Sequence, residues 1–219
     1  MFVGHYGPAF VGKGKLPRIP LWVLFLAVQW MDVCWSILVF AGVEKLRIVP
    51  GFVAASNFDL YYMPYTHSLP GSLALSVLLG IVVALFYRQG RGAVFIVVAL
   101  AVFSHWLLDL IVHVPDLPLY DDSAKVGFGL WRYLWPSLIL EFTVLIAGAY
   151  YYARALPSAR LSGDIALGAF VAFLVLLQFV ITFTQIAAGS IPGAASAALG
   201  SYVLLTGLAA LVDRARNSP

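Results

Sequence analysis

Six long apolar segments occupy most of this 219-residue chain, and they limit it to one broad class of fold. A helix needs about 20 mainly apolar residues to cross the hydrocarbon core of a bilayer. Because 62% of the residues are hydrophobic and only 11% are charged, against about 25% charged in soluble domains, we predict an all-α integral membrane protein. The expected bundle of about six transmembrane helices forms one polytopic domain over residues 1–219. The segments cover residues 20–43, 68–87, 93–114, 130–153, 165–187 and 193–212.

Lysine and arginine residues divide unequally between the two ends of these predicted helices. Four of the 13 fall at one end, namely Lys45, Arg47, Lys125 and Arg132. The other nine fall at the opposite end, namely Lys13, Lys15, Arg18, Arg88, Arg91, Arg154, Arg160, Arg214 and Arg216. Because cytoplasmic loops carry the excess of basic residues, we expect both termini in the cytoplasm. The net charge of +3 then reflects topology and does not indicate nucleic-acid binding.

The stretch FSHWLLDLIVHVPDL, which begins at Phe103, places ionisable side chains in an apolar helix. His105, Asp109 and His113 are spaced four residues apart, so they form one polar stripe. Ionised groups at mid-membrane cost about 2.5–3.5 kcal/mol each and usually face the bundle interior. The stripe therefore needs a partner, which could be a metal ion, a counter-charge or water. The alternative is a hydrogen-bonded pair that only fixes helix packing.

Isolated polar residues occur at a similar depth in three other segments, as Asp32, His67 and Glu141. Neutral imidazole and carboxylate are the usual ligands of zinc, and they also suit manganese or iron. We therefore predict one divalent metal, zinc before manganese or iron. The predicted ligands are Asp32, His67, His105 and Asp109. Glu141 or His113 would serve as general base or would orient the ligands. His113 lies about 12 Å beyond His105 along the axis, too far to share one ion, so it would hold a second ion or orient substrate.

The stretch YTHSLPGSL predicts a helix start. Ser68 is a suitable N-cap, with Pro70 tolerated in the first turn. His67 would then lie at the positive end of the helix dipole, which keeps its ring neutral, beside N–H groups that suit a phosphate oxyanion. The alternative is a simple capped helix in which His67 is an interfacial residue.

Four stretches taken together, VGHYGPAF, QWMDVCW, PYTHSLPGSL and SHWLLDLIVHVPDLPLY, resemble the YdjM-like family of bacterial membrane-bound metal-dependent hydrolases. The resemblance covers about the first two-thirds of the chain, and it implies a location in the bacterial inner membrane. That family is grouped with zinc-dependent phospholipase C by its His/Asp pattern, so the resemblance implies hydrolysis of a phosphoester. Asp32 stands alone where the relatives often show an acidic pair. The metal-site residues that the resemblance implies are His5, Asp32, His67, His105 and Asp109.

His5 precedes the first predicted helix, on the cytoplasmic side of the expected topology. The segment FVGHYGPAFVG is apolar enough to enter the bundle as a short re-entrant segment, which is allowed where protein or water surrounds it. Such a segment would bring His5 to the site.

The last two segments, residues 165–212, carry no charged residue and no histidine. Their stretch GAASAALGSY suits close helix packing, so we expect these helices to act as a scaffold or as a contact between copies in a homo-oligomer. The catalytic half would cover about residues 1–153.

Two functional hypotheses follow. The first is a membrane-embedded hydrolase that acts on a phosphoester or lipid-like substrate through a His/Asp-bound divalent metal and activated water. The second is a proton- or ion-coupled transporter that uses the same buried Asp, Glu and His residues as a relay. The usual sign of a transporter, interrupted helices in two related halves, is not found. A structural membrane protein with polar helix contacts is a third interpretation.

Overall fold

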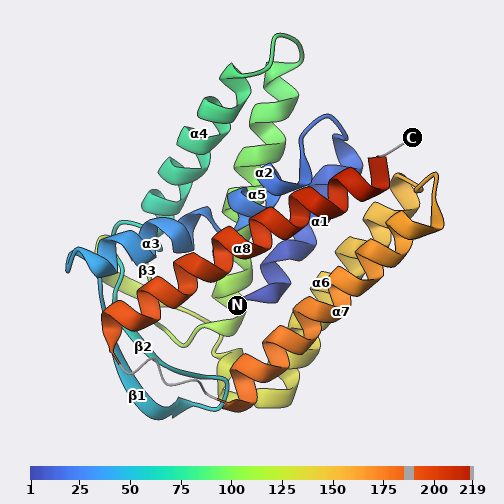
Figure 1. Cartoon of the computed structure of the whole chain (residues 1–219). Coiled ribbons are helices and arrows are strands. Elements are labelled where there is room, and N and C mark those ends of the chain that lie inside the picture. Colours follow the sequence, from blue (N-terminus) through green and yellow to red (C-terminus); the bar gives the residue numbers. More distant parts are fainter. Residues whose placement is uncertain (185–189, 218–219) are drawn as a thin grey trace.

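The computed structural model describes residues 1–184 and 190–217, and it is mostly helical (Figure 1). Four of the described helices are long and apolar enough to cross a membrane, as expected of a membrane protein. They match the third to sixth predicted segments, with ends that shift by a few residues. The end of the fifth predicted segment, residues 185–187, lies outside the described residues. The four helices are α5 (Arg91–Val112), α6 (Leu134–Ala155), α7 (Leu161–Thr184) and α8 (Ile191–Asn217).

The prediction of six membrane-spanning helices is not confirmed. The first predicted segment is divided into α2 (Leu21–Val28) and α3 (Trp30–Phe40), which are bent by 52° at Gln29. Gln29 has φ −104° and ψ 5°, outside the helical region, so the hydrogen-bond ladder is interrupted there. The second predicted segment forms α4 (Leu69–Leu85), an apolar helix of 17 residues, which is shorter than the about 20 residues of a typical span. By length and composition the described residues hold four spans, or five if the bent pair is one span.

Two antiparallel hairpins correct the all-α prediction. Both lie at the same end of the molecule (Figure 1). Connections of this length rarely stay without regular structure inside a compact domain, because their backbone groups need partners. The strands are β1 (Lys45–Val53), β2 (Ser56–Tyr62), β3 (Leu117–Tyr120) and β4 (Ser123–Val126). Side chains from the hairpins and from α3 share a second, smaller core, which includes Trp35, Leu46, Leu60, Met63 and Leu117.

The N-terminal segment enters the bundle, as the sequence predicted for FVGHYGPAFVG. It forms a short 3-10 helix, η1 (Val3–His5), followed by α1 (Tyr6–Lys15), which packs against α2, α5 and α6. The approach of α1 to α6 is close enough to require glycine on both helices. A Cβ atom at Gly7 would lie 2.4 Å from the Val144 carbonyl oxygen, and one at Gly148 would lie 2.3 Å from the Gly7 carbonyl oxygen.

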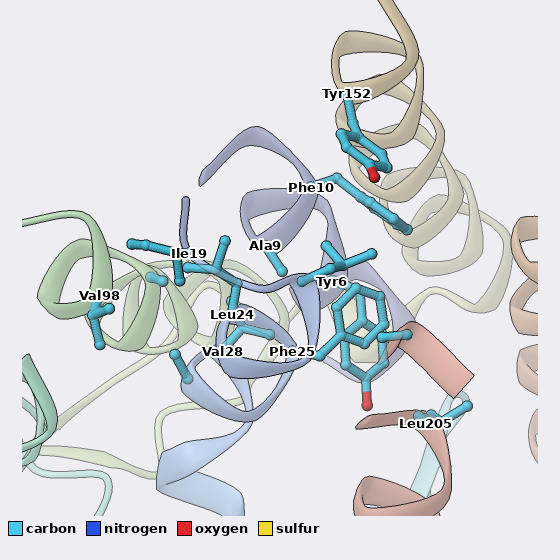
Figure 2. Close-up of a cluster of buried hydrophobic side chains, with 14 of the residues drawn as sticks. Tyr6, Ala9, Phe10, Ile19, Leu24, Phe25, Val28, Val98, Tyr152 and Leu205 are labelled. Carbon is cyan, nitrogen blue, oxygen red and sulfur yellow. The ribbon is translucent and has the colours of Figure 1, made fainter. Parts of the chain in front are cut away.

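Aromatic packing holds α1 in place (Figure 2). The rings of Tyr6 and Phe25 stack at 4.3 Å between centroids, and Phe10 meets Phe25 edge-on at 5.2 Å. Phe10 also stacks on Tyr152 of α6 at 5.8 Å, and Phe25 reaches Phe170 of α7 at 5.5 Å. These rings are the centre of the main core, so the inserted segment is an integral part of the bundle.

Basic side chains tie the helix ends together at the end of the molecule opposite the hairpins. Lys13 pairs with Asp213 at 3.0 Å, and Arg18 donates to the Gly90 carbonyl oxygen at 2.9 Å. Met1 does not lie at this end. It is buried inside the bundle (Figure 1), so only the segment from Lys13 onward reaches the basic end.

The close approach of α1 and α6 leads to a prediction with opposite signs at two glycines. Gly148→Ala should lower the free energy of unfolding by about 1–3 kcal/mol, because the added methyl group overpacks the helix contact. Gly207→Ala should raise it by about 0.5–1 kcal/mol, because no described atom lies near that Cβ position and alanine favours the helix. Thermal unfolding in detergent measures both. A stabilising Gly148→Ala would contradict the α1–α6 contact.

Candidate metal centre

The structure brings two carboxylates and two histidines of the predicted site into one buried cluster. His105 Nε2 lies 3.1 Å from Asp109 Oδ2 and 3.5 Å from Asp32 Oδ1. His67 Nε2 lies 3.4 Å from Asp32 Oδ1 and 3.8 Å from Asp109 Oδ2. These residues come from α3, from the loop before α4 and from α5, so the bundle interior assembles what the sequence separates.

His5 also reaches this cluster. Its Nε2 atom lies 3.2 Å from Asp109 Oδ1. Its ring stacks on that of His105, with 3.7 Å between the centroids and 6° between the planes. His5 reaches the cluster because η1, which ends at His5, is buried inside the bundle.

Hydrogen bonds set the orientation of two imidazole rings. His105 Nδ1 lies 2.6 Å from the carbonyl oxygen of Val28, and His113 Nδ1 lies 2.8 Å from Asp116 Oδ1. Carbonyl and carboxylate oxygens only accept, so each Nδ1 carries the proton and donates it. In a neutral ring, the free lone pair is then on Nε2, which faces the carboxylates. Outer partners of this kind commonly orient metal-binding histidines.

Two Nε2 atoms have no hydrogen-bond partner among the described residues, although each lies close to a carboxylate oxygen. They belong to His5 and His105, which are both fully buried. Buried polar nitrogens are rarely left unpaired. Because Val28 holds the proton of His105 on Nδ1, a neutral His105 ring directs its Nε2 lone pair at the Asp109 carboxylate, which repels it, and a cation between the two atoms would turn that repulsion into coordination.

Among residues 1–184 and 190–217, two overlapping groups of His and Asp side chains have ligand atoms within 4.8 Å of one another. The first contains His5, His105 and Asp109, and the second contains Asp32, His67 and His105. His105 is shared by both groups. Three protein ligands that combine imidazole and carboxylate suit zinc, so the donor set fits the predicted metal.

Asp109 lies at the centre of the cluster. Its Oδ1 atom faces His5 and lies 2.6 Å from the α-amino group of Met1. Its Oδ2 atom faces His67, His105 and also His113, whose Nε2 lies 3.6 Å away. His113 was predicted to lie too far from His105 to share one ion, but both histidines face the same Asp109 oxygen. His113 ends α5 in an extended conformation, and its ring lies 4.2 Å from that of Trp131.

Glu141 is occupied by the N-terminal segment. Its Oε1 atom accepts a hydrogen bond from the Phe2 amide at 3.0 Å, and its Oε2 atom accepts one from the Gly4 amide at 2.8 Å. Of the two roles predicted for Glu141, this geometry fits positioning better than proton transfer. The carboxylate holds η1 where His5 can contact Asp109.

The predicted start of α4 is confirmed. Ser68 is the N-cap, its hydroxyl accepts from the Gly71 amide at 3.1 Å, and a proline occupies the first turn. The indole N–H of Trp106 donates to the His67 carbonyl oxygen at 2.9 Å. The cap and the indole together hold His67 beside α5.

A contact from α8, one of the two helices predicted as scaffold, was not expected from the sequence. The Tyr202 hydroxyl donates to Asp32 Oδ2 at 2.9 Å, which leaves Oδ1 to face the histidines. A single tyrosine in an apolar helix carries no signal that could have identified this contact. One helix outside the predicted catalytic half, α8, therefore contacts the site directly.

Comparisons of this chain with family models, with curated proteins and with solved structures find no match.

The position of Glu141 leads to a second prediction. Glu141→Gln should lower the free energy of unfolding by about 2 kcal/mol, because the amide nitrogen cannot accept the backbone N–H bonds that the carboxylate accepts. The matched control is Asp59→Asn, which removes a partly exposed pair with Arg47 and should cost less than about 1 kcal/mol. Thermal unfolding measures both variants. A Glu141→Gln protein of unchanged stability that bound metal normally but lost turnover would indicate a general base instead.

Proposed function

We propose that this protein is a membrane-embedded hydrolase that depends on a divalent metal. The observation that carries the proposal is the convergence of the Nε2 atoms of three histidines, His5, His67 and His105, on the carboxylates of Asp32 and Asp109 inside the bundle. Imidazole and carboxylate together are the usual protein ligands of a catalytic zinc ion.

The residues that would hold the metal are those of the two overlapping groups. Zinc fits best, with manganese and iron as the other candidates. When bound, a divalent cation polarises the scissile group and lowers the pKa of water at the site toward about 7. The protein's own part is to fix the lone pair of His105 through Val28, and to hold Asp32 through Tyr202.

A phosphoester of lipid-like character is the proposed substrate class. Two arguments support it: the resemblance of the His/Asp stretches to metal-dependent hydrolases, and the location of the site inside an apolar bundle. Asp32 is the most exposed carboxylate of the cluster, at 17% of its side chain, against 2% for Asp109. We propose that substrate approaches on the Asp32 side.

Zinc content is the first test of the metal site. Wild-type protein should retain at least one zinc ion per chain after mild chelation and reloading, because two groups of ligands are available. His105→Ala should retain almost none, because His105 belongs to both groups, while the control Asp59→Asn should match the wild type. Elemental analysis measures all three. Near-zero zinc, manganese and iron in the wild type would exclude the metal site and favour the proton-relay alternative.

The rate of hydrolysis should depend on the bound metal. Zinc-loaded wild type should hydrolyse a soluble phosphodiester or a short-chain phospholipid, and comparing the two probes decides between a general phosphoesterase and a lipid-specific enzyme. His105→Ala should lose more than about 100-fold in rate, since even outer partners of metal ligands cost 10–100-fold. Metal-loaded wild type that cleaved neither probe would contradict the hydrolase proposal and leave the metal site standing.

The proposed topology places the basic end of the bundle in the bacterial cytoplasm and the hairpins outside the inner membrane. Alkaline phosphatase, which is active only outside the cytoplasm, should be inactive when fused after Gly90, in the turn before α5. It should be active when fused after Asp122, in the β3–β4 turn. The reverse pattern would overturn the orientation.

A further inference from the structure

Glu44 is a buried carboxylate that follows α3, and its exposed fraction is 1%. It accepts three hydrogen bonds from the loop before α4. Oε1 accepts from the amides of Tyr65 and Thr66, both at 2.9 Å, and Oε2 accepts from the Thr66 hydroxyl at 2.6 Å.

The Thr66 hydroxyl connects this carboxylate to the metal centre. Its Oγ1 atom lies 2.8 Å from His67 Nδ1. An ionised carboxylate only accepts, so the single hydroxyl proton of Thr66 points to Glu44. The Thr66 oxygen can then only accept from His67, which places the ring proton on Nδ1. The lone pair of His67 Nε2 is left facing Asp32 and Asp109.

We propose that Glu44 and Thr66 are positioning residues that fix the tautomer of His67 for metal binding. The inference rests on the proposed metal site for its purpose, but the tautomer itself is a property of the metal-free protein. His105 and His113 reach the same state through one direct acceptor each. The tautomer of His67 is set by Glu44 through the Thr66 hydroxyl, so it depends on the negative charge of Glu44.

The two oxygens of Glu44 separate a structural role from a positioning role. Oε1 holds the loop backbone, and Oε2 serves the Thr66 hydroxyl. A change at Oε2 or at the hydroxyl should therefore alter His67 while the loop stays in place.

Glu44→Gln is the sharpest test because it has the same shape and reverses the direction of donation. The amide oxygen must replace Oε1 to accept the two backbone N–H groups, which turns the NH₂ group toward Thr66. The Thr66 hydroxyl would then accept from Gln and donate to His67 Nδ1, so the ring proton would move to Nε2. Zinc affinity should fall about 10–100-fold, as it does when outer partners of ligands are changed.

Two substitutions at Thr66 form a matched pair. Thr66→Val keeps the shape and removes the hydroxyl, so His67 should lose its preference for a proton on Nδ1. Thr66→Ser keeps the hydroxyl and should behave as the wild type. Both variants keep the backbone amides that Glu44 Oε1 binds. They therefore test the inference even if the Glu44→Gln protein does not fold.

The measurement is ¹⁵N NMR of histidine-labelled, metal-free full-length protein in detergent, near about pH 8, where a histidine of ordinary pKa is neutral. The chain has only four histidines, and a His67→Asn sample identifies the His67 signals. Competition with a chelator then gives the zinc affinity of each variant.

The expected result is Nδ1 protonation of His67 in wild type and Thr66→Ser, and its loss in Thr66→Val and Glu44→Gln. A wild-type His67 protonated on Nε2, or a Thr66→Val ring that keeps its proton on Nδ1, overturns the inference. An unchanged zinc affinity in both altered variants overturns its role in metal binding. Wild type that shows the expected tautomer but binds no metal would refute the proposed function and leave the tautomer assignment standing.

Discussion

The burial of Asp109 is the constraint on which the rest of the site depends. An isolated ionised carboxylate in an apolar interior is so unfavourable that such groups are paired, hydrogen-bonded or bound to a metal. Asp109 has an exposed fraction of 2%, and its two oxygens face different partners. Parts of the chain far apart in sequence meet around it. These partners are the α-amino group of Met1 and the imidazole rings of His5, His67, His105 and His113.

Insertion of the N-terminal segment also buries backbone amides, which need the Glu141 carboxylate as their hydrogen-bond acceptor. Amides at the start of η1 are hidden from water, and the Glu141 carboxylate accepts the hydrogen bonds of Phe2 and Gly4. Gly7 and Gly148 allow α1 to lie close enough to α6 for this contact. One buried acid therefore holds the segment in place, and another, Asp109, receives the histidine that the segment carries.

Much of the site was predictable because local geometry is regular. The spacing of His105 and Asp109 places them on one face of any helix, and Ser68 caps α4 as its sequence predicts. The hairpins and the bend at Gln29 were not predictable in the same way. Apolar periodicity cannot distinguish one long helix from two short ones that meet at an angle, and the strands depend on cross-chain pairing that no local pattern specifies.

The sequence by itself determined the membrane class, the polar stripe of α5 and the set of side chains available for a metal. It did so because hydropathy and a four-residue spacing act within one segment. Only the tertiary structure decided that His5 stacks on His105, that Glu141 serves the backbone, and that Glu44 and Tyr202 support His67 and Asp32. Most of these contacts join residues far apart in the chain. They exist because packing and the need to pair every buried polar group select one arrangement of the helices.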